Sequence, residues 1–275
     1  MLRNKESIIP VTTILEKAYM NIFKKAAYKL KKYPKGEVTV IIAAGGSGSR
    51  MGGVPKPLLD LCGKPVIEYS LETFSACECV GRIFIAAKAD DIPSYEKIRM
   101  SGRFPKLAGV VEGGGTRSES VANAFTAAMR DGMTDFVAVH DGARPLITPD
   151  EIERAAKLAA VYGSGVCASR VRDTVKRASR GGKVTENIDR EGLWLISTPQ
   201  IFSTEHYHAA LSAAVASAKK NGSSPIDFTD DSTMFGDAGF TVMLSEASAD
   251  NIKITYPDDI AVAEGILAAR ERGKA

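Results

Sequence analysis

A glycine-rich segment follows the first apolar run of the chain and is its clearest candidate for chemistry. Four glycines occur in the nine residues from Ala44 to Gly52, so the backbone can turn tightly and present amide N–H groups to phosphate oxygens. Arg50 and Lys56 place two cations beside this loop, which suits a phosphoryl or nucleotidyl transfer that depends on positioning and charge neutralisation. We therefore expect Arg50 and Lys56 to be catalytic, and the loop to bind a nucleotide triphosphate through Ala44, Gly45, Gly46, Ser47 and Gly48.

Two other glycine-rich phosphate loops fit this segment poorly. A P-loop needs Gly-Lys-Ser/Thr, which the segment lacks. The dinucleotide fingerprint needs a third glycine, but Gly46 and Gly48 are followed by Met51 at that position. The segment therefore indicates nucleotide transfer rather than dinucleotide binding.

A lone acid, Asp141, stands at the end of the apolar run from Phe136 to His140. Ligands of open α/β sheets bind at the carboxyl ends of the strands, where an Asp can hold a Mg²⁺ ion that bridges phosphate oxygens. We expect Asp141 to bind Mg²⁺ or another divalent cation.

Short apolar runs alternate with helical patterns over most of the chain, and these elements must position the candidate residues. The expected strands are Val38–Ala43, Arg82–Ala87, Phe136–His140 and Gly165–Ser169. The expected helices are Pro65–Phe74, Ser118–Arg130, Pro149–Val161, Ser203–Lys219 and Pro257–Arg272. Such alternation predicts an α/β fold with a mostly parallel sheet covered on both faces.

A polar stretch, Val171–Asn187, interrupts this order. It is rich in residues that favour strands and contains Gly181-Gly182 as a turn. We expect a β-hairpin that projects from the domain.

The N-terminal segment has a different composition from the rest. Residues 1–37 hold nine Lys or Arg against three Glu, a net charge of +6, so the other 238 residues carry −3 of the chain's +3. Apolar residues recur at helical spacing over Ser7–Lys32. We expect a basic N-terminal helical extension over residues 1–37 and a catalytic domain over residues 38–275. A basic amphipathic helix can lie on an anionic membrane, but the lysines on its apolar face and its lack of Trp favour packing on protein instead.

Composition excludes several function classes. Apolar residues make up 44% and charged residues 25% of the chain, both ordinary for a globular enzyme. The negative charge of residues 38–275 argues against a nucleic-acid partner. The sequence has no run of about 18 apolar residues and no signal-like start, so we expect a cytoplasmic protein. Four scattered cysteines and three histidines do not supply a zinc site.

The loop resembles a known signature. Ala-Gly-Gly-x-Gly-x-Arg-Met-Gly…Pro-Lys at residues 44–56 is similar to that of the sugar-phosphate nucleotidyltransferases, which implies a Rossmann-like fold and dependence on Mg²⁺. Glu112–Val121 resembles the cytidine-binding stretch of the cytidylyltransferase branch, which implies base contacts from Gly114, Gly115 and Ser120.

Later blocks resemble one family within this branch, the 2-C-methyl-D-erythritol 4-phosphate cytidylyltransferases of non-mevalonate isoprenoid synthesis. The blocks are His140–Pro145, Arg172–Arg177, Asp189–Trp194, Thr198–Phe202 and Asp250–Thr255, within a resemblance that covers roughly residues 38–270. By this resemblance Gly142 and Arg144 bind the nucleotide. Thr174, Arg190, Thr198 and Lys253 hold the methylerythritol phosphate.

The resemblance also implies an assembly and a mechanism. In the family, a β-arm at about residues 171–192 clasps a second subunit, which implies a homodimer. A phosphate oxygen of the polyol phosphate attacks the α-phosphorus of CTP and displaces pyrophosphate, while Arg50, Lys56, Lys253 and the cation on Asp141 stabilise the developing charge. This nucleophile needs no deprotonation at neutral pH, so we expect His140 to be structural rather than a base.

Two alternative functions are open, and the sequence departs from the family's pattern at two positions. Ribitol 5-phosphate cytidylyltransferase shares the loop and the Thr-Pro-Gln block, while Asp173-Thr174 and Arg190 favour methylerythritol phosphate. A non-catalytic scaffold is the other alternative, but it predicts the loss of a charged site residue, and none is missing. Pro57 stands where many members have Gln, and Gly236 where Glu is common; we expect these departures to bear on substrate positioning.

Overall fold

The computed structural model describes residues 35–46, 54–132, 134–220 and 226–273, all within one compact unit, Tyr33–Ala275. The helix expected over Ser7–Lys32 lies outside the described residues, so the division of the chain at residue 37 stays a prediction. None of the helices in the described part combines the length and the apolar character that a membrane span requires.

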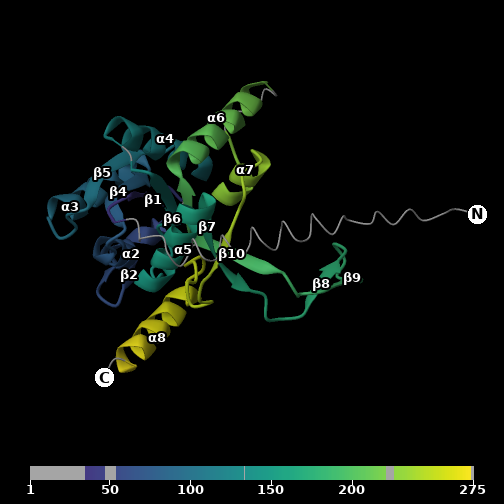
Figure 1. Cartoon of the computed structure of the whole chain (residues 1–275). Helices are drawn as coiled ribbons and strands as arrows, with labels where there is room; N and C mark the ends of the chain where they lie inside the picture. Colours follow the sequence, from purple (N-terminus) through teal and green to yellow (C-terminus); the bar gives the residue numbers. More distant parts are fainter. Residues whose placement is uncertain (1–34, 47–53, 133, 221–225, 274–275) are drawn as a thin grey trace, which may run out of the picture. The chain divides into compact units, whose positions relative to one another are not determined.

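A seven-stranded sheet forms the centre of the described residues, in the order β11-β7-β10-β6-β1-β4-β5 (Figure 1). Only β10 runs antiparallel to its neighbours in this sheet, which confirms the mostly parallel sheet predicted from the apolar runs. The strands are β1 (Val38–Ala43), β4 (Val80–Ala87), β5 (Leu107–Glu112), β6 (Phe136–Asp141), β7 (Ser164–Arg170), β10 (Trp194–Ser203) and β11 (Leu244–Glu246).

Helices cover both faces of this sheet (Figure 1). On one face Val40 and Ile42 of β1 join a core built with α2 (Val66–Ala76), α3 (Ile92–Met100) and α5 (Pro149–Tyr162). On the other face Ile41 joins a core built with α4 (Arg117–Arg130), α6 (Thr204–Lys220) and α7 (Asp231–Asp237). The alternation along β1 therefore anchors two layers of helices, as a sheet buried on both sides requires. The C-terminal helix α8 (Asp258–Arg272) belongs to a smaller third core around Leu61.

Local signals explain where the two central helices begin and end. Thr116 caps α4 by accepting a hydrogen bond from the Glu119 amide. Thr148 and Glu151 form a capping box at the start of α5, and Gly163 ends this helix at a φ of 86°, a conformation that favours glycine. The Thr116 cap begins α4 only a short turn after β5 ends at Glu112.

The five helices predicted within the described residues agree with the structure to within about two residues at each end, but other elements were not predicted. These are β5, β10, β11, α3 and α7. Two short 3-10 helices, Lys56–Leu58 and Ala89–Asp91, and the two-stranded pair of β2 (Asp60–Leu61) and β3 (Lys64–Pro65) were also not predicted. Strand β11 has three residues and α7 has seven, so neither contains enough residues to show a periodicity.

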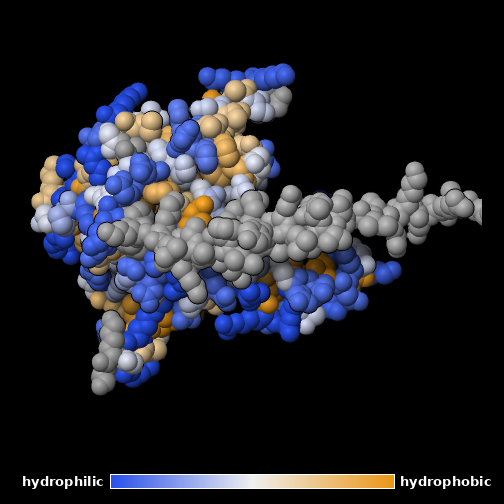
Figure 2. All heavy atoms as spheres, viewed as in Figure 1, coloured by the Kyte–Doolittle hydropathy of each residue, from blue (hydrophilic) through white to orange (hydrophobic). Residues whose placement is uncertain are grey.

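The predicted β-arm is present as an antiparallel hairpin of β8 (Val175–Ala178) and β9 (Val184–Ile188), which extends away from the sheet (Figure 1). Gly182 turns the hairpin at a φ of 81°, and its amide donates to the Ser179 carbonyl at 3.0 Å. Most of the visible arm surface is hydrophilic (Figure 2), although Val184 keeps 51% of its surface exposed. Within this chain the arm is therefore stabilised mainly by its own hydrogen bonds.

Candidate active site

The carboxyl ends of four neighbouring strands surround a cavity of about 520 Å³. Because β6, β1, β4 and β5 are parallel and adjacent, the residues that follow them meet at one edge of the sheet. This edge brings together nine of the residues predicted to act, namely Ala44, Gly45, Gly46, Lys56, Gly114, Gly115, Ser120, Asp141 and Lys253. Ser47, Gly48 and Arg50 lie outside the described residues.

Asp141, at the end of β6, is the centre of the charged part of the cavity. Its Oδ1 accepts from Arg117 Nε at 3.0 Å, and its Oδ2 lies 2.9 Å from Lys253 Nζ. Burial alone would raise the pKa of Asp141, but its attraction to Arg117 and Lys253 outweighs burial and holds the pKa well below its usual range. The carboxylate is therefore ionised throughout the neutral range and can face cations or a metal.

Arg117 joins Asp141 to the interior of the protein. Its Nη1 lies 2.7 Å from Oδ2 of the fully buried Asp231, on α7. The hydroxyl of Tyr207, on α6, donates to the other oxygen of Asp231 at 2.7 Å. Burial would lower the pKa of Arg117, but Asp231 and Asp141 raise it above its usual value. Arg117 is therefore a permanent cation held between two carboxylates.

A glycine turn between β5 and α4 forms the uncharged part of the cavity. The amides of Gly114 and Gly115 donate to Ser120 Oγ at 3.1 Å and to Glu119 Oε2 at 2.8 Å. A Cβ at Gly114 would lie 2.3 Å from the Cβ of Glu119, so the turn cannot accept a side chain there without moving. Ser120 also donates to the Thr116 carbonyl at 2.8 Å. These contacts tie the turn to the start of α4, and both glycines line the cavity.

His140 precedes Asp141 but is fully buried behind the cavity. Burial lowers the pKa of His140 to about 4, so the ring is neutral at pH 7. Its two nitrogens lie 3.1 Å from Thr198 Oγ1 and 3.0 Å from the Arg144 carbonyl. The ring therefore fixes two neighbouring segments and has no route to a substrate in the cavity.

Thr198, Gly142 and Arg144 lie around Asp141 but do not line the described cavity. Thr198 Oγ1 accepts from the Asp141 amide at 3.0 Å. A Cβ at Gly142 would lie 3.2 Å from the Ala43 carbonyl oxygen and from Pro57, so this glycine is enclosed by the chain. The Arg144 guanidinium reaches the Asn251 carbonyl at 2.7 Å. Their predicted contacts with substrate or nucleotide stay predictions, while their observed contacts support Asp141 and Lys253.

Thr174 and Arg190 lie at the base of the arm, away from Asp141. Arg190 donates to the Arg172 carbonyl and lines a separate hollow of about 400 Å³ with Arg170 and Glu246. Thr174 is exposed. The described residues of one chain therefore leave both predicted substrate contacts outside the cavity that holds Asp141.

Sequence reasoning missed three residues of this site. Arg117 belongs to the Glu112–Val121 stretch, but no role was predicted for it. A cation in the first turn of a helix is repelled by the helix dipole, so its presence there indicates acidic partners nearby. Asp231 is 114 residues away from Arg117, and no local pattern relates the two. Lys88 follows β4 directly and lines the cavity, a position that the carboxyl-end rule could have identified.

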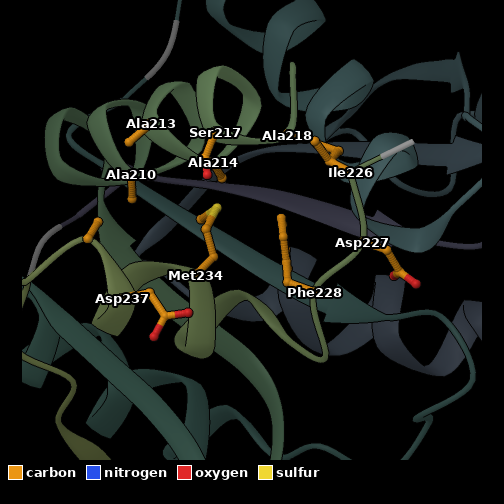
Figure 3. Close-up of a pocket in the computed structure, with 11 residues that line it drawn as sticks. Ala210, Ala213, Ala214, Ser217, Ala218, Ile226, Asp227, Phe228, Met234 and Asp237 are labelled. Atoms are coloured by element: carbon orange, nitrogen blue, oxygen red, sulfur yellow. The ribbon is translucent and has the colours of Figure 1, made fainter. Parts of the chain in front are cut away.

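A second cavity, of about 580 Å³, lies between α6 and α7 (Figure 3). Its lining consists mainly of alanines together with Ile226, Phe228 and Met234. The charged groups among its described lining residues are the carboxylates of Asp227 and Asp237 (Figure 3). The described lining of this cavity offers none of the cations that a triphosphate needs, so the site at Asp141 is the candidate active site.

Comparisons with known proteins agree with this geometry. Residues 38–269 match the family model described as IspD: 2-C-methyl-D-erythritol 4-phosphate cytidylyltransferase. A 2-C-methyl-D-erythritol 4-phosphate cytidylyltransferase of Pelotomaculum thermopropionicum is 37% identical over 238 residues, which span 86% of this chain and 96% of the relative. One of Aromatoleum aromaticum is also 37% identical, over 84% of this chain and 95% of the relative.

Solved structures give the same result. The Thermus thermophilus 2-C-methyl-D-erythritol 4-phosphate cytidylyltransferase has a TM-score of 0.65 at 30% identity, over 84% of this chain and 98% of that one. The 4-diphosphocytidyl-2C-methyl-D-erythritol synthase of Anaerococcus prevotii has a TM-score of 0.71 at 26% identity, over 84% of this chain and 98% of that one. The chain therefore belongs to the 2-C-methyl-D-erythritol 4-phosphate cytidylyltransferase family.

Proposed function

We propose that the chain transfers CMP from CTP to 2-C-methyl-D-erythritol 4-phosphate, giving 4-diphosphocytidyl-2-C-methyl-D-erythritol and pyrophosphate in non-mevalonate isoprenoid synthesis. The observation that carries this proposal is the single cavity that joins a glycine turn to the charged group of Asp141, Arg117, Lys56 and Lys253. The substrates come from the names of the relatives.

The two parts of the cavity suit the two parts of CTP. The turn at Gly114 and Gly115 fits the flat base, while Gly45 and Gly46 with Lys56 fit the phosphates. A phosphate oxygen of the polyol phosphate then attacks the α-phosphorus, a new P–O bond forms, and the bond to the β-phosphate breaks with release of pyrophosphate. A phosphate monoester is largely a dianion at pH 7, so the reaction does not require a general base, and the neutral, buried His140 is consistent with this chemistry.

Divalent-cation dependence is part of the proposal. The described residues contain no group of three or more His, Cys, Asp or Glu that could hold a metal by themselves. Mg²⁺ in nucleotide enzymes is commonly held by one or two carboxylates together with substrate phosphates. Asp141 fits this arrangement, because its ionised carboxylate is the acid that lines the cavity. When bound, Mg²⁺ would supply neutralisation of the phosphate charge.

A homodimer is proposed to complete the site. Thr174 and Arg190 lie at the arm, and their predicted role requires them to reach a phosphate near Lys253. Leu195 and Ile196, in the part of β10 next to the arm, keep 61% and 38% of their surfaces exposed, as expected of residues that a second copy covers.

The free thiols of all four cysteines suit the reducing cytoplasm, which we propose as the location.

Purified protein should release pyrophosphate from CTP and Mg²⁺ when 2-C-methyl-D-erythritol 4-phosphate is added. Ribitol 5-phosphate, the substrate of the alternative activity, is expected to support a rate at least about tenfold lower. Lys56→Ala should lower kcat by roughly a hundredfold or more, the scale of one preorganised charge donor. The assignment would be wrong if ribitol 5-phosphate were the better substrate, or if Lys56→Ala kept full turnover at saturating CTP.

A further inference from the structure

Arg117 occupies a position that its own helix disfavours. It is the first residue of α4, where the positive end of the helix dipole repels a cation. Its side chain is 26% exposed and lines the cavity, so it could have turned toward water. Instead it lies between Asp141 and the fully buried Asp231. The two carboxylates therefore determine where Arg117 stays.

Asp231 makes this placement firm. Its oxygens are held at 2.7 Å by Arg117 and at 2.7 Å by the Tyr207 hydroxyl, and these partners come from α4 and α6. Lys253, the other close partner of Asp141, is 43% exposed and approaches on a flexible stem. Lys253 can thus leave Asp141 to meet a phosphate, whereas Arg117 is anchored beside it.

The charges around Asp141 oppose a free metal ion. Arg117 and Lys253 each take one of its two oxygens, and Arg144 Nε lies 3.6 Å from Oδ2. Three cations thus face one carboxylate, and the second carboxylate, Asp231, is turned away into the core. A divalent ion would meet net repulsion here, while the negative charge of bound CTP would reverse the sign.

We propose that Arg117, anchored by Asp231, is a positioning residue that keeps Asp141 from binding a free divalent cation, so that the cation enters only together with the nucleotide. This inference rests on the proposed function only for the identity of the nucleotide. Its first observable, metal binding without nucleotide, is independent of turnover.

The test is a titration of the full chain with Mn²⁺, in which free Mn²⁺ is measured by its electron paramagnetic resonance signal, with and without CTP and without the polyol phosphate. Because CTP itself chelates Mn²⁺, each titration with CTP is compared with the same mixture without protein. The wild-type protein should bind one Mn²⁺ per site with CTP and only weakly without it. Arg117→Met should bind Mn²⁺ without CTP at least about tenfold more tightly than wild type. Asp231→Asn removes the carboxylate that anchors Arg117, so this variant should show a smaller gain in Mn²⁺ affinity without CTP.

Two controls locate the effect. Arg130→Met removes an exposed arginine from the last turn of the same helix and should bind like wild type. The double variant Arg117→Met with Asp141→Asn should lose the gain in Mn²⁺ affinity, because it lacks the Asp141 carboxylate that would bind the ion. The proposal is overturned if wild type binds Mn²⁺ equally well with and without CTP, or if Arg117→Met binds no better than wild type.

A folding defect would not block the test. Arg117→Met leaves the Asp231 charge buried without its ion-pair partner, which commonly destabilises a folded protein strongly. The double variant Arg117→Met with Asp231→Asn removes both charges, and circular dichroism would show that it is folded. The same gain in Mn²⁺ affinity is expected from it, and its absence would equally overturn the proposal. Pyrophosphate release by wild type separates this outcome from failure of the proposed function.

Discussion

Arg144 donates from Nη1 to the backbone oxygen of Asn251 at 2.7 Å, across 107 residues of sequence. The amide of Ile254 donates to the Ala143 carbonyl at 2.9 Å, so the residues on both sides of Lys253 are attached to the loop after β6. Lys253 therefore reaches Asp141 from a segment that β6 itself positions.

Arg144→Met should lower kcat by roughly tenfold to a hundredfold, because a displaced Lys253 no longer meets the developing charge. Steady-state pyrophosphate release would measure this change. Arg154→Met is the matched control, since Arg154 also donates to a backbone carbonyl, that of Glu246, but on the exposed face of α5. Wild-type turnover by Arg144→Met would show that the contact with Asn251 does not position Lys253.

Stability should depend on pH through His140. The pKa of His140 is lowered to about 4 in the folded protein by burial, against about 6.5 in an unfolded chain. The unfolded state therefore binds more protons between these values, so stability is fully present above about pH 6.5 and falls as the pH drops toward 4, by roughly 3 kcal/mol over the window.

Urea unfolding at several pH values between 7.5 and 4.5 would measure this loss. His140→Gln keeps a polar side chain but cannot take up the proton, so its free energy of unfolding should vary less over this range. Asp141 contributes little to the slope, because its pKa in the folded protein is held well below the usual range and the pKa of about 3.9 of an unfolded Asp also lies below pH 4.5. Parallel slopes for wild type and His140→Gln would contradict the prediction.

Lys88 should contribute to binding of the nucleotide. It lies between the phosphate loop after β1 and the glycine turn after β5, and its exposed side chain lines the same cavity. Lys88→Met should raise the KM for CTP roughly tenfold, the scale of one hydrogen bond to a charged group, with a smaller change in kcat. Lys97→Met, at an exposed position on α3, is the control. An unchanged KM for CTP would remove Lys88 from the site.

The sequence predicted the parts of this site that depend on local chemistry. Gly113–Gly115 follow β5, which was not predicted, but the buried runs did predict β1 and β6. Gly45 and Asp141 follow these two runs, so their meeting at one edge could be expected. The relationship of Arg117 to Asp231 could not, because it depends on how α7 packs against α4. Strand β10 was missed because the residues from Ser197 to Gln200 interrupt its apolar sequence, and its pairing with β7 shifts in register between Ile196 and Gln200.

Arg190, at the base of the arm, is expected to complete the cavity of the other subunit in a homodimer. If Arg190 serves the cavity of a second copy, an inactive Lys56→Ala chain still carries an intact arm, and an inactive Arg190→Met chain still carries an intact cavity. A mixed dimer would then contain one site built from the intact cavity and the intact arm. Co-expression of the two variants with different affinity tags, followed by two-step purification, isolates this mixed dimer.

The mixed dimer should regain about half of the wild-type rate per dimer, because one of its two sites is complete. Each variant alone should stay inactive, and a mixed dimer of Lys56→Ala with Lys253→Met is the control, because both changes fall in the cavity. If Arg190 acted within its own chain, neither site of the mixed dimer would be complete, and no activity would return. Pyrophosphate release therefore decides between the two arrangements.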